Sequence, residues 1–143
     1  MKKCPFCNAK NIKQHEIIYE DKNYLVFFSK KPVTLGHTLV IPKKHVKFIL
    51  TLSDKELDGL FELVKKTAKI IHKTLKPDGL DIGTNYGRMA GQSIGHLHIH
   101  VIPRYTGDFT FLQIVSKSVN PYSSILKNEE AKIADKLRSA WHD

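Results

Sequence analysis

Short stretches rich in β-branched and aromatic residues recur along the chain, with polar turn residues between them. Two of them, residues 15–20 and 24–29, flank three polar residues, an arrangement typical of a β-hairpin. Three more stretches, residues 36–42, 80–86 and 97–103, predict further strands. The pattern therefore predicts about five strands.

One long stretch has helical periodicity instead. Ser53 and Glu56 form a capping box, in which each side chain can bond the other residue's backbone N–H, so a helix is expected to begin there. Apolar residues then follow at spacings of three and four and predict one buried stripe: Leu57, Leu60, Phe61, Val64, Ala68, Ile71 and Leu75. Residues 76–79 contain Pro and Gly and end this helix, and residues 128–141 predict a C-terminal helix. Strands on both sides of one long helix indicate an α+β fold with an antiparallel sheet.

The length of 143 residues suits one domain with a core of its own, and no repeat or Pro/Gly-rich linker divides it. We therefore expect a single domain over residues 1–143. No apolar run is long enough to span a bilayer, and the first residues lack the apolar region of a signal peptide. The expected compartment is the cytoplasm, with no membrane partner.

Lysine and arginine outnumber aspartate and glutamate by 23 to 14, which gives a formal net charge of +9. A basic surplus favours phosphate-bearing partners. The positive residues are spread along the chain in short pairs, without the basic block or interleaved aromatics of a nucleic-acid reader. We therefore expect no nucleic-acid partner, and most of the charge is typical of a solvated surface.

Three histidines alternate with aliphatic residues in the last predicted strand. His96, His98 and His100 would line one face while the aliphatic residues between them face a core. Two uses of such a polar stripe stay open. The imidazoles could share a metal ion, or one of them could act as a nucleophile while its second nitrogen is held by a hydrogen bond.

Both cysteines of the chain lie in one C-x-x-C motif, Cys4 and Cys7. In a cytoplasmic protein this spacing indicates half of a zinc site or a redox pair. A zinc site would need two further ligands from histidines or carboxylates, since there are no more cysteines. The plain alternative is two reduced thiols near a frayed end of the chain.

The loop before the histidines is rich in glycine and neutral polar residues. Gly87 and Gly91 allow close approach of the backbone, and Asn85, Gln92 and Ser93 offer uncharged hydrogen bonds. Such a loop suits a phosphate or an oxyanion.

Residues 96–102 resemble, without a mismatch, the signature of the histidine-triad (HIT) family. The similarity extends to residues 90–93 before the triad, to residues 103–104 after it and to a second landmark at residues 36–45. It covers roughly residues 4–109. The resemblance implies a HIT-like α+β fold, in which an antiparallel sheet of about five strands carries one long helix and a C-terminal helix. It also implies a homodimer.

The resemblance implies a hydrolase or transferase for purine nucleotides. His98 would attack the α-phosphorus and form a covalent nucleotidyl-histidine, which water then hydrolyses. His100 would donate to the phosphate oxygens. Asn85 and Ser93 would contact the phosphate or the leaving group, with Gln92 beside them in the same loop, and His37 would support the triad from behind.

A zinc-bearing subset of the family joins a C-x-x-C to two histidines. Carried onto this chain, the ligands would be Cys4, Cys7, His45 and His96, with residues 1–10 forming a zinc-knuckle-like segment. Such a site is closed and structural, because four protein ligands leave no position for a catalytic water. No catalytic metal is expected.

Three points keep the specificity and the class of function open. Many family members carry Asp or Asn eight residues before the histidine at position 37, where this chain has Ser29. Residues 103–109 resemble the branch that cleaves diadenosine polyphosphates, whereas residues 41–45 and 92–93 resemble the branch that cleaves phosphoramidates. The alternatives to a nucleotidyl-histidine hydrolase are a nucleotide-binding scaffold with little turnover and a zinc hydrolase with the triad as ligands.

Overall fold

A five-stranded antiparallel sheet with the order β1-β2-β3-β5-β4 forms the centre of the protein. The computed structural model describes residues 3–108 and 124–143. Met1 and Lys2 of the predicted zinc-knuckle-like segment and Phe109 of the segment 103–109 therefore lie outside the described residues. The strands are β1 (Ile17–Glu20), β2 (Tyr24–Phe28), β3 (Thr38–Pro42), β4 (Gly79–Gly83) and β5 (Ile99–Arg104). The helices are α1 (Asp54–Leu75) and α3 (Ser124–Trp141), with short 3₁₀ helices at Ala9–Asn11, Gln14–Glu16, Ile49–Thr51 and Arg88–Ala90.

The predicted α+β fold is confirmed, although several element ends differ from the expectation. β5 begins at Ile99 rather than at residue 97, because Leu97 N–H donates to Val46 O outside the sheet at 2.7 Å. β4 ends at Gly83 rather than at residue 86, where the Thr84 hydroxyl bonds His98 O at 2.8 Å. Bonds to the Thr84 hydroxyl and to Val46 O thus take the place of regular strand pairing just before β5. As a result, His100 is the one histidine of the triad that lies in a strand.

The ends of three other elements also differ from the predicted ones. Gln14–Glu16 forms a 3₁₀ turn, so β1 is shorter than predicted. β3 begins at Thr38 rather than at residue 36, because Gly36 has a φ of +91°, outside the extended region of a strand and strained for residues with a side chain. The C-terminal helix begins at Ser124, four residues before the expected start.

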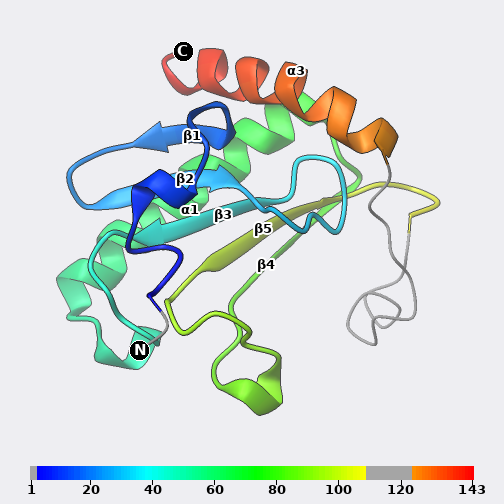
Figure 1. Ribbon diagram of the computed structural model, residues 1–143. Helices are drawn as coiled ribbons and strands as arrows, with labels where there is room; N and C mark the ends of the chain where they lie inside the picture. Colours follow the sequence, from blue (N-terminus) through cyan, green and yellow to red (C-terminus); the bar gives the residue numbers. More distant parts are fainter. Residues whose placement is uncertain (1–2, 109–123) are drawn as a thin grey trace.

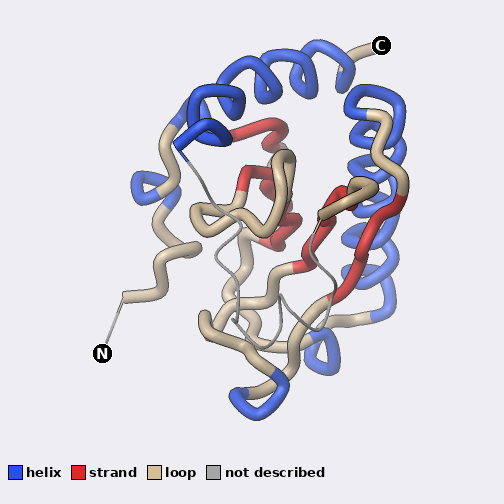
Figure 2. Tube along the Cα trace, turned by 90° about the vertical axis from the view of Figure 1, so that its right-hand side faces the viewer, coloured by secondary structure: helices blue, strands red, loops and turns tan. Residues whose placement is uncertain are grey.

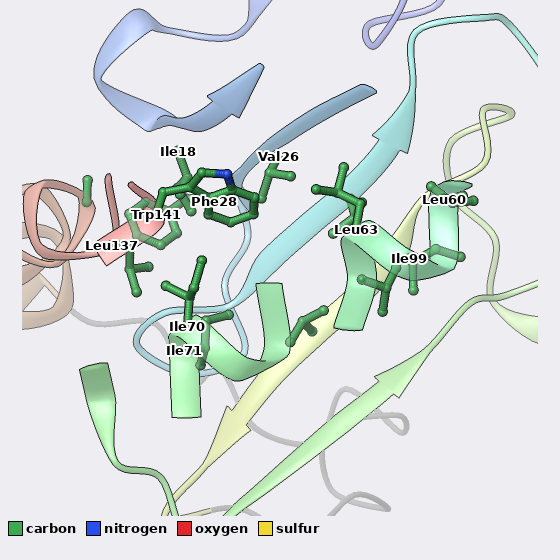
Figure 3. Packing of buried hydrophobic residues seen from close by; sticks show 14 of the residues in the cluster. Ile18, Val26, Phe28, Leu60, Leu63, Ile70, Ile71, Ile99, Leu137 and Trp141 are labelled. Atoms are coloured by element: carbon green, nitrogen blue, oxygen red, sulfur yellow. The ribbon is translucent and has the colours of Figure 1, made fainter. Parts of the chain in front are cut away.

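Helices α1 and α3 cover one face of the sheet (Figure 1). Ser53 caps α1 as predicted, with its side chain accepting from Glu56 N–H at 3.2 Å while Glu56 bonds back to Ser53 N–H. Figure 3 shows the apolar side chains of both helices meeting those of the strands: Ile18, Val26, Phe28, Leu60, Leu63, Ile70, Ile71, Ile99, Leu137 and Trp141. α3 therefore shares the core of the sheet and α1.

The predicted stripe on α1 is wrong at one residue. Phe61 is 42% exposed, whereas Leu63, Thr67 and Ile70 are buried beside Leu60. The helix is turned so that Phe61 is exposed on the side toward the outer strand β4, where it lines the same hollow as Ile82.

The opposite face of the sheet carries a second, smaller apolar cluster that no helix of eight or more residues covers in the described part. The N-terminal segment crosses this face, while α1 runs along the other side (Figures 1 and 2). Its members are Ile12, Ile17, Leu25, Phe27, Leu39 and Ile41, with Phe6 packed against them. Within residues 3–108 and 124–143, neither of the two long helices is apolar enough to traverse a bilayer.

Candidate functional site

The alternation around the triad separates its residues between the two faces of the sheet, as predicted. Leu97, Ile99 and Val101 are buried in the core under α1. His100 pairs with Leu39 of β3, which belongs to the cluster on the opposite face. The histidine side chains therefore face the side of the sheet that α1 and α3 do not cover.

A cavity of about 600 Å³ lies on this face, and we call it the histidine cavity. One set of its lining residues is polar: Ser29, His37, Asn85, Ser93, His98 and His100. Another set is apolar: Pro5, Phe6, Ile12, Phe27, Val33, Leu39 and Ile94. Lys30 and Lys31 also line it, and the described lining residues include no aspartate or glutamate. The cavity thus offers polar and apolar walls and a positive rim, which suits an anionic ligand with a flat apolar part.

A backbone carbonyl fixes the tautomer of His98. His98 Nδ1 lies 2.8 Å from His96 O, and a carbonyl oxygen can only accept, so Nδ1 carries the hydrogen. Nε2 of the neutral ring is then left with its lone pair. Because His98 is only 6% exposed and lines the cavity, this lone pair is presented to a ligand rather than to bulk water.

A chain of three groups fixes the tautomer of His100. Val33 N–H donates to His37 Nδ1 at 3.0 Å, so the hydrogen of His37 is on Nε2. His37 Nε2–H then donates to His100 Nδ1 at 2.9 Å. In the neutral state the remaining hydrogen of His100 is on Nε2, where it can be donated to an anion. His37 therefore lies behind the triad, where the resemblance placed it.

Burial keeps these imidazoles neutral. It is the main cause that lowers the pKa of His37 to about 3 and the pKa of His100 to about 4, with smaller contributions from neighbouring histidines. Burial also lowers the pKa of His98. A neutral ring is the form that a nucleophile requires, and a neutral His100 can accept from His37 at Nδ1 while Nε2–H donates.

We expect the free energy of unfolding to fall as the pH is lowered from about 6.5 toward 4. Below the ordinary imidazole pKa of 6.5, the unfolded chain protonates His37 and His100 whereas the folded chain does not until the pH reaches about 4 or 3. In that window each group lowers the free energy of unfolding by about 1.4 kcal/mol for each pH unit of acidification, and above pH 6.5 it has no such effect. Urea unfolding at a series of pH values measures this slope. It should be shallower in His37→Gln, and equal slopes in the two proteins would contradict the argument.

The glycine-rich loop delivers two of its three predicted residues to the cavity. Asn85 and Ser93 line it, and Asn85 Nδ2 also donates to Ala90 O at 2.7 Å. Gln92 is not among the lining residues, because its side chain accepts from Gly87 N–H at 2.9 Å and donates to Lys47 O at 3.0 Å. Both ends of its amide hold the loop in shape.

The four predicted zinc ligands come together, and we call them the Cys/His group. Cys4 Sγ lies 3.3 Å from His96 Nδ1, and Cys7 Sγ lies 3.0 Å from His45 Nδ1. All four ligand atoms lie within 4.8 Å of one another. His96 Nε2–H donates to Pro42 O at 2.8 Å, which leaves Nδ1 as the free lone pair toward the sulfurs. Two thiols and two imidazoles at this separation fit a tetrahedral zinc ion.

The Cys/His group contains only one member of the triad. Among the described residues, neither His98 nor His100 belongs to a set of ligand atoms that could hold a metal. The geometry therefore favours separate roles for the three histidines over a metal ion shared by them.

Sequence reasoning did not single out the apolar wall or the rim of the cavity. Phe6 and Phe27 give the wall two aromatic rings, 5.4 Å apart between centroids. Lys30 and Lys31 form one of the basic pairs that were predicted to lie on the solvated surface, and they line the cavity as well. Buried Ser29 also lines the cavity, and its hydroxyl accepts from Lys31 N–H at 3.3 Å. The alternation of β2 could have indicated that Phe27 and Ser29 share a face.

Comparison with known sequences agrees with this geometry. The family described as "HIT domain" matches residues 10–107. An uncharacterized HIT-like protein of Methanocaldococcus jannaschii is 43% identical over 106 residues, which are 73% of this chain and 81% of that protein. The asymmetrical bis(5'-nucleosyl)-tetraphosphatase of Schizosaccharomyces pombe is 36% identical over 114 residues, which are 80% of this chain and 59% of that enzyme.

Two solved structures have the same fold over nearly the whole chain. A hypothetical histidine triad nucleotide-binding protein of Sulfolobus tokodaii has a TM-score of 0.77 and 36% identity, covering 97% of this chain and 92% of that one. A zinc-bound histidine triad family protein of Mycobacterium smegmatis has a TM-score of 0.78 and 29% identity, covering 98% and 94%.

Proposed function

The chain belongs to the HIT domain family, and from this premise we propose that it is a nucleotide hydrolase that acts through a covalent nucleotidyl-histidine at His98. Its substrates are nucleoside phosphoramidates or dinucleoside polyphosphates, with a purine base. The observation that carries the proposal is the hydrogen bond from His98 Nδ1 to His96 O, which directs the free lone pair of Nε2 into the histidine cavity.

The reaction has two displacements at the α-phosphorus. In the first, His98 Nε2 forms a bond to phosphorus while the bond to the leaving group breaks, and the electron pair departs with that group; the nitrogen of a phosphoramidate takes up a proton from solvent as it leaves. His98 Nδ1 keeps its hydrogen, so the positive charge that develops on the ring is stabilised by His96 O. In the second, water attacks phosphorus while the bond from phosphorus to His98 Nε2 breaks, and the proton of the water passes to solvent; the nucleoside monophosphate is released and His98 recovers its lone pair.

His100 and the cavity rim stabilise the negative charge of the phosphate. His100 Nε2–H donates to a phosphate oxygen, because His37 occupies its other nitrogen. Asn85 and Ser93 lie in the same cavity, where an amide and a hydroxyl can bond the phosphate or the leaving group. Lys30 and Lys31 at the rim attract an anion, and no described lining carboxylate opposes them.

A direct assay tests the proposal. The purified protein is incubated with diadenosine tetraphosphate and with adenosine phosphoramidate, and release of AMP is measured for both. The relatedness to a dinucleoside tetraphosphatase supports the first substrate. We expect AMP from at least one of them. Tight binding of AMP without turnover of either substrate would instead identify a nucleotide-binding scaffold.

We also propose that the Cys/His group binds a structural zinc ion. The donor set and its spacing support this, and so does the zinc-bound relative of the same fold. When bound, the ion would cross-link the N-terminal segment to His45 and His96, with no open position for catalysis. Reduced thiols of this kind persist in the cytoplasm, which is the compartment we propose.

We propose that two copies of the chain associate through α1 and β4. β4 is an outer strand of the sheet, and beside it lies a hollow of about 530 Å³ whose exposed wall is mostly apolar. Its lining residues are Phe61, Val64, Lys65, Ala68, Lys69, His72, Leu80 and Ile82. Phe61 and Ile82 are 42% and 49% exposed, which favours a partner that covers them. A second copy fits, because an outer strand can pair with its own equivalent.

Replacing Ile82 by aspartate should therefore convert a dimer into a monomer, because it places a charge in the proposed contact. Sedimentation velocity measures the change, with Leu50→Asp as a control at another exposed apolar residue. If both variants sediment as the unmodified protein does, association through this surface is wrong.

A further inference from the structure

Phe6 lies between the two thiols of the Cys/His group and also lines the histidine cavity. Its ring meets that of His96 at 5.8 Å between centroids and that of His98 at 5.5 Å, both edge to face. One side chain therefore contacts a ligand of the proposed zinc site and the proposed nucleophile.

The segment that carries Phe6 has few other attachments to the protein. Residues 4–7 form a turn outside every helix and strand, closed by a bond of 3.3 Å from Cys7 N–H to Cys4 O. A bond of 3.5 Å from Asn11 Nδ2 to Pro5 O joins the turn to the next residues. The two sulfurs contact His96 and His45, and the Phe6 ring packs against Phe27 of β2, so these groups join the turn to the rest of the protein.

We propose that the Cys/His group controls the affinity for nucleotide through Phe6. A metal ion in the group fixes the turn, and with it Phe6 as a wall of the cavity against Phe27 and His98. Without the ion the turn is held by the thiol contacts, the bond from Asn11 to Pro5 O and the packing of Phe6 itself, so the wall is less firmly fixed. The inference rests on the proposed function, because it takes a nucleotide as the ligand of the cavity.

The coupling must act in both directions. If the metal strengthens nucleotide binding by some factor, the nucleotide strengthens metal binding by the same factor. Removal of an aromatic contact to a base weakens binding by roughly 5- to 150-fold. We expect the coupling to be about 10-fold, at the lower end of that range, because Ile12, Phe27 and Leu39 keep the rest of the apolar wall in place.

Two measurements test the coupling without measuring turnover. Calorimetric titration gives the dissociation constant of AMP for zinc-loaded and for chelator-stripped protein. Competition with a coloured chelator gives the zinc affinity with and without AMP. In the unmodified protein we expect stripping to weaken AMP binding about 10-fold and AMP to tighten zinc binding by the same factor.

Phe6→Ala should separate the two sites. It should still bind one zinc ion, bind AMP about 10-fold more weakly, and show no dependence of either affinity on the other ligand. Phe6→Leu should keep part of the coupling, and Leu50→Ala, a change at a side chain that is 73% exposed, should keep all of it.

The same zinc dependence in Phe6→Ala as in the unmodified protein would overturn the inference, and so would independence of zinc in the unmodified protein. General unfolding on removal of zinc would give the first of these results, since it would affect both proteins alike. Failure of zinc-loaded protein to bind AMP would overturn the proposed function, and this inference with it.

Discussion

Replacement of His98 by asparagine is expected to lower kcat/KM for AMP release by about 10³-fold or more. Asparagine offers a side-chain N–H to His96 O but has no lone-pair nitrogen for phosphorus, so the covalent route is closed. Turnover of diadenosine tetraphosphate or adenosine phosphoramidate, whichever the unmodified protein cleaves faster, measures the loss. Rapid quenching should trap acid-labile label on the unmodified protein and none on the variant.

A matched control distinguishes the nucleophile from other histidines. His15 is an exposed histidine on a 3₁₀ helix outside the cavity lining, so His15→Ala should keep full activity. AMP binding should persist in His98→Asn, because His100 and the apolar wall are unchanged. Retention of more than about a tenth of the activity in His98→Asn would exclude the covalent mechanism.

Replacement of Cys7 by serine is expected to abolish stoichiometric zinc binding and lower the thermal midpoint by roughly 10 °C. The estimate takes a free zinc concentration of about 1,000 times the dissociation constant, worth about 4 kcal/mol, and a shift of about 2–4 °C per kcal/mol for a domain near this size. Metal analysis and thermal unfolding measure both effects. Chelator-treated protein should unfold at the midpoint of Cys7→Ser.

The same variant separates structural from catalytic zinc. Below its lowered midpoint, Cys7→Ser should keep kcat within a few-fold at saturating substrate, because His98 and His100 lie outside the Cys/His group. A complete loss of kcat in folded Cys7→Ser would instead make the Cys/His group part of the catalytic machinery. Full zinc retention in both Cys4→Ser and Cys7→Ser would remove the four-ligand site.

The sequence predicted the elements of the fold well where a local pattern reports hydrogen bonding or burial directly. The capping box at Ser53 and the alternation of Leu97, Ile99 and Val101 are of this kind. The stripe on α1 failed at Phe61, because a spacing of three and four fits two neighbouring stripes equally well. Which stripe is buried depends on how the helix is turned on the sheet, and this is a property of the tertiary packing.

The candidate site could be predicted to a similar extent and for similar reasons. A period of two brings His98 and His100 to one face, and the C-x-x-C spacing suggested half of a metal site. The contact of Phe6 with His98 could not be predicted in this way, because the two residues are 92 positions apart in the chain. The same separation holds for Cys4 and His96. For Gln92, residue type alone could not show that both ends of the amide bond the backbone.

The hydrogen-bond chain behind His100 begins at a main-chain amide, that of Val33, and not at a side chain. The orientation of the proton that meets the phosphate is therefore independent of which side chain occupies position 33, with one exception. Proline has no amide hydrogen, so it alone among the common residues would release His37 to bind with either nitrogen. Sequence variation at this position can thus change the apolar wall of the cavity, which Val33 also lines, and still leave the tautomer of His37 as it is.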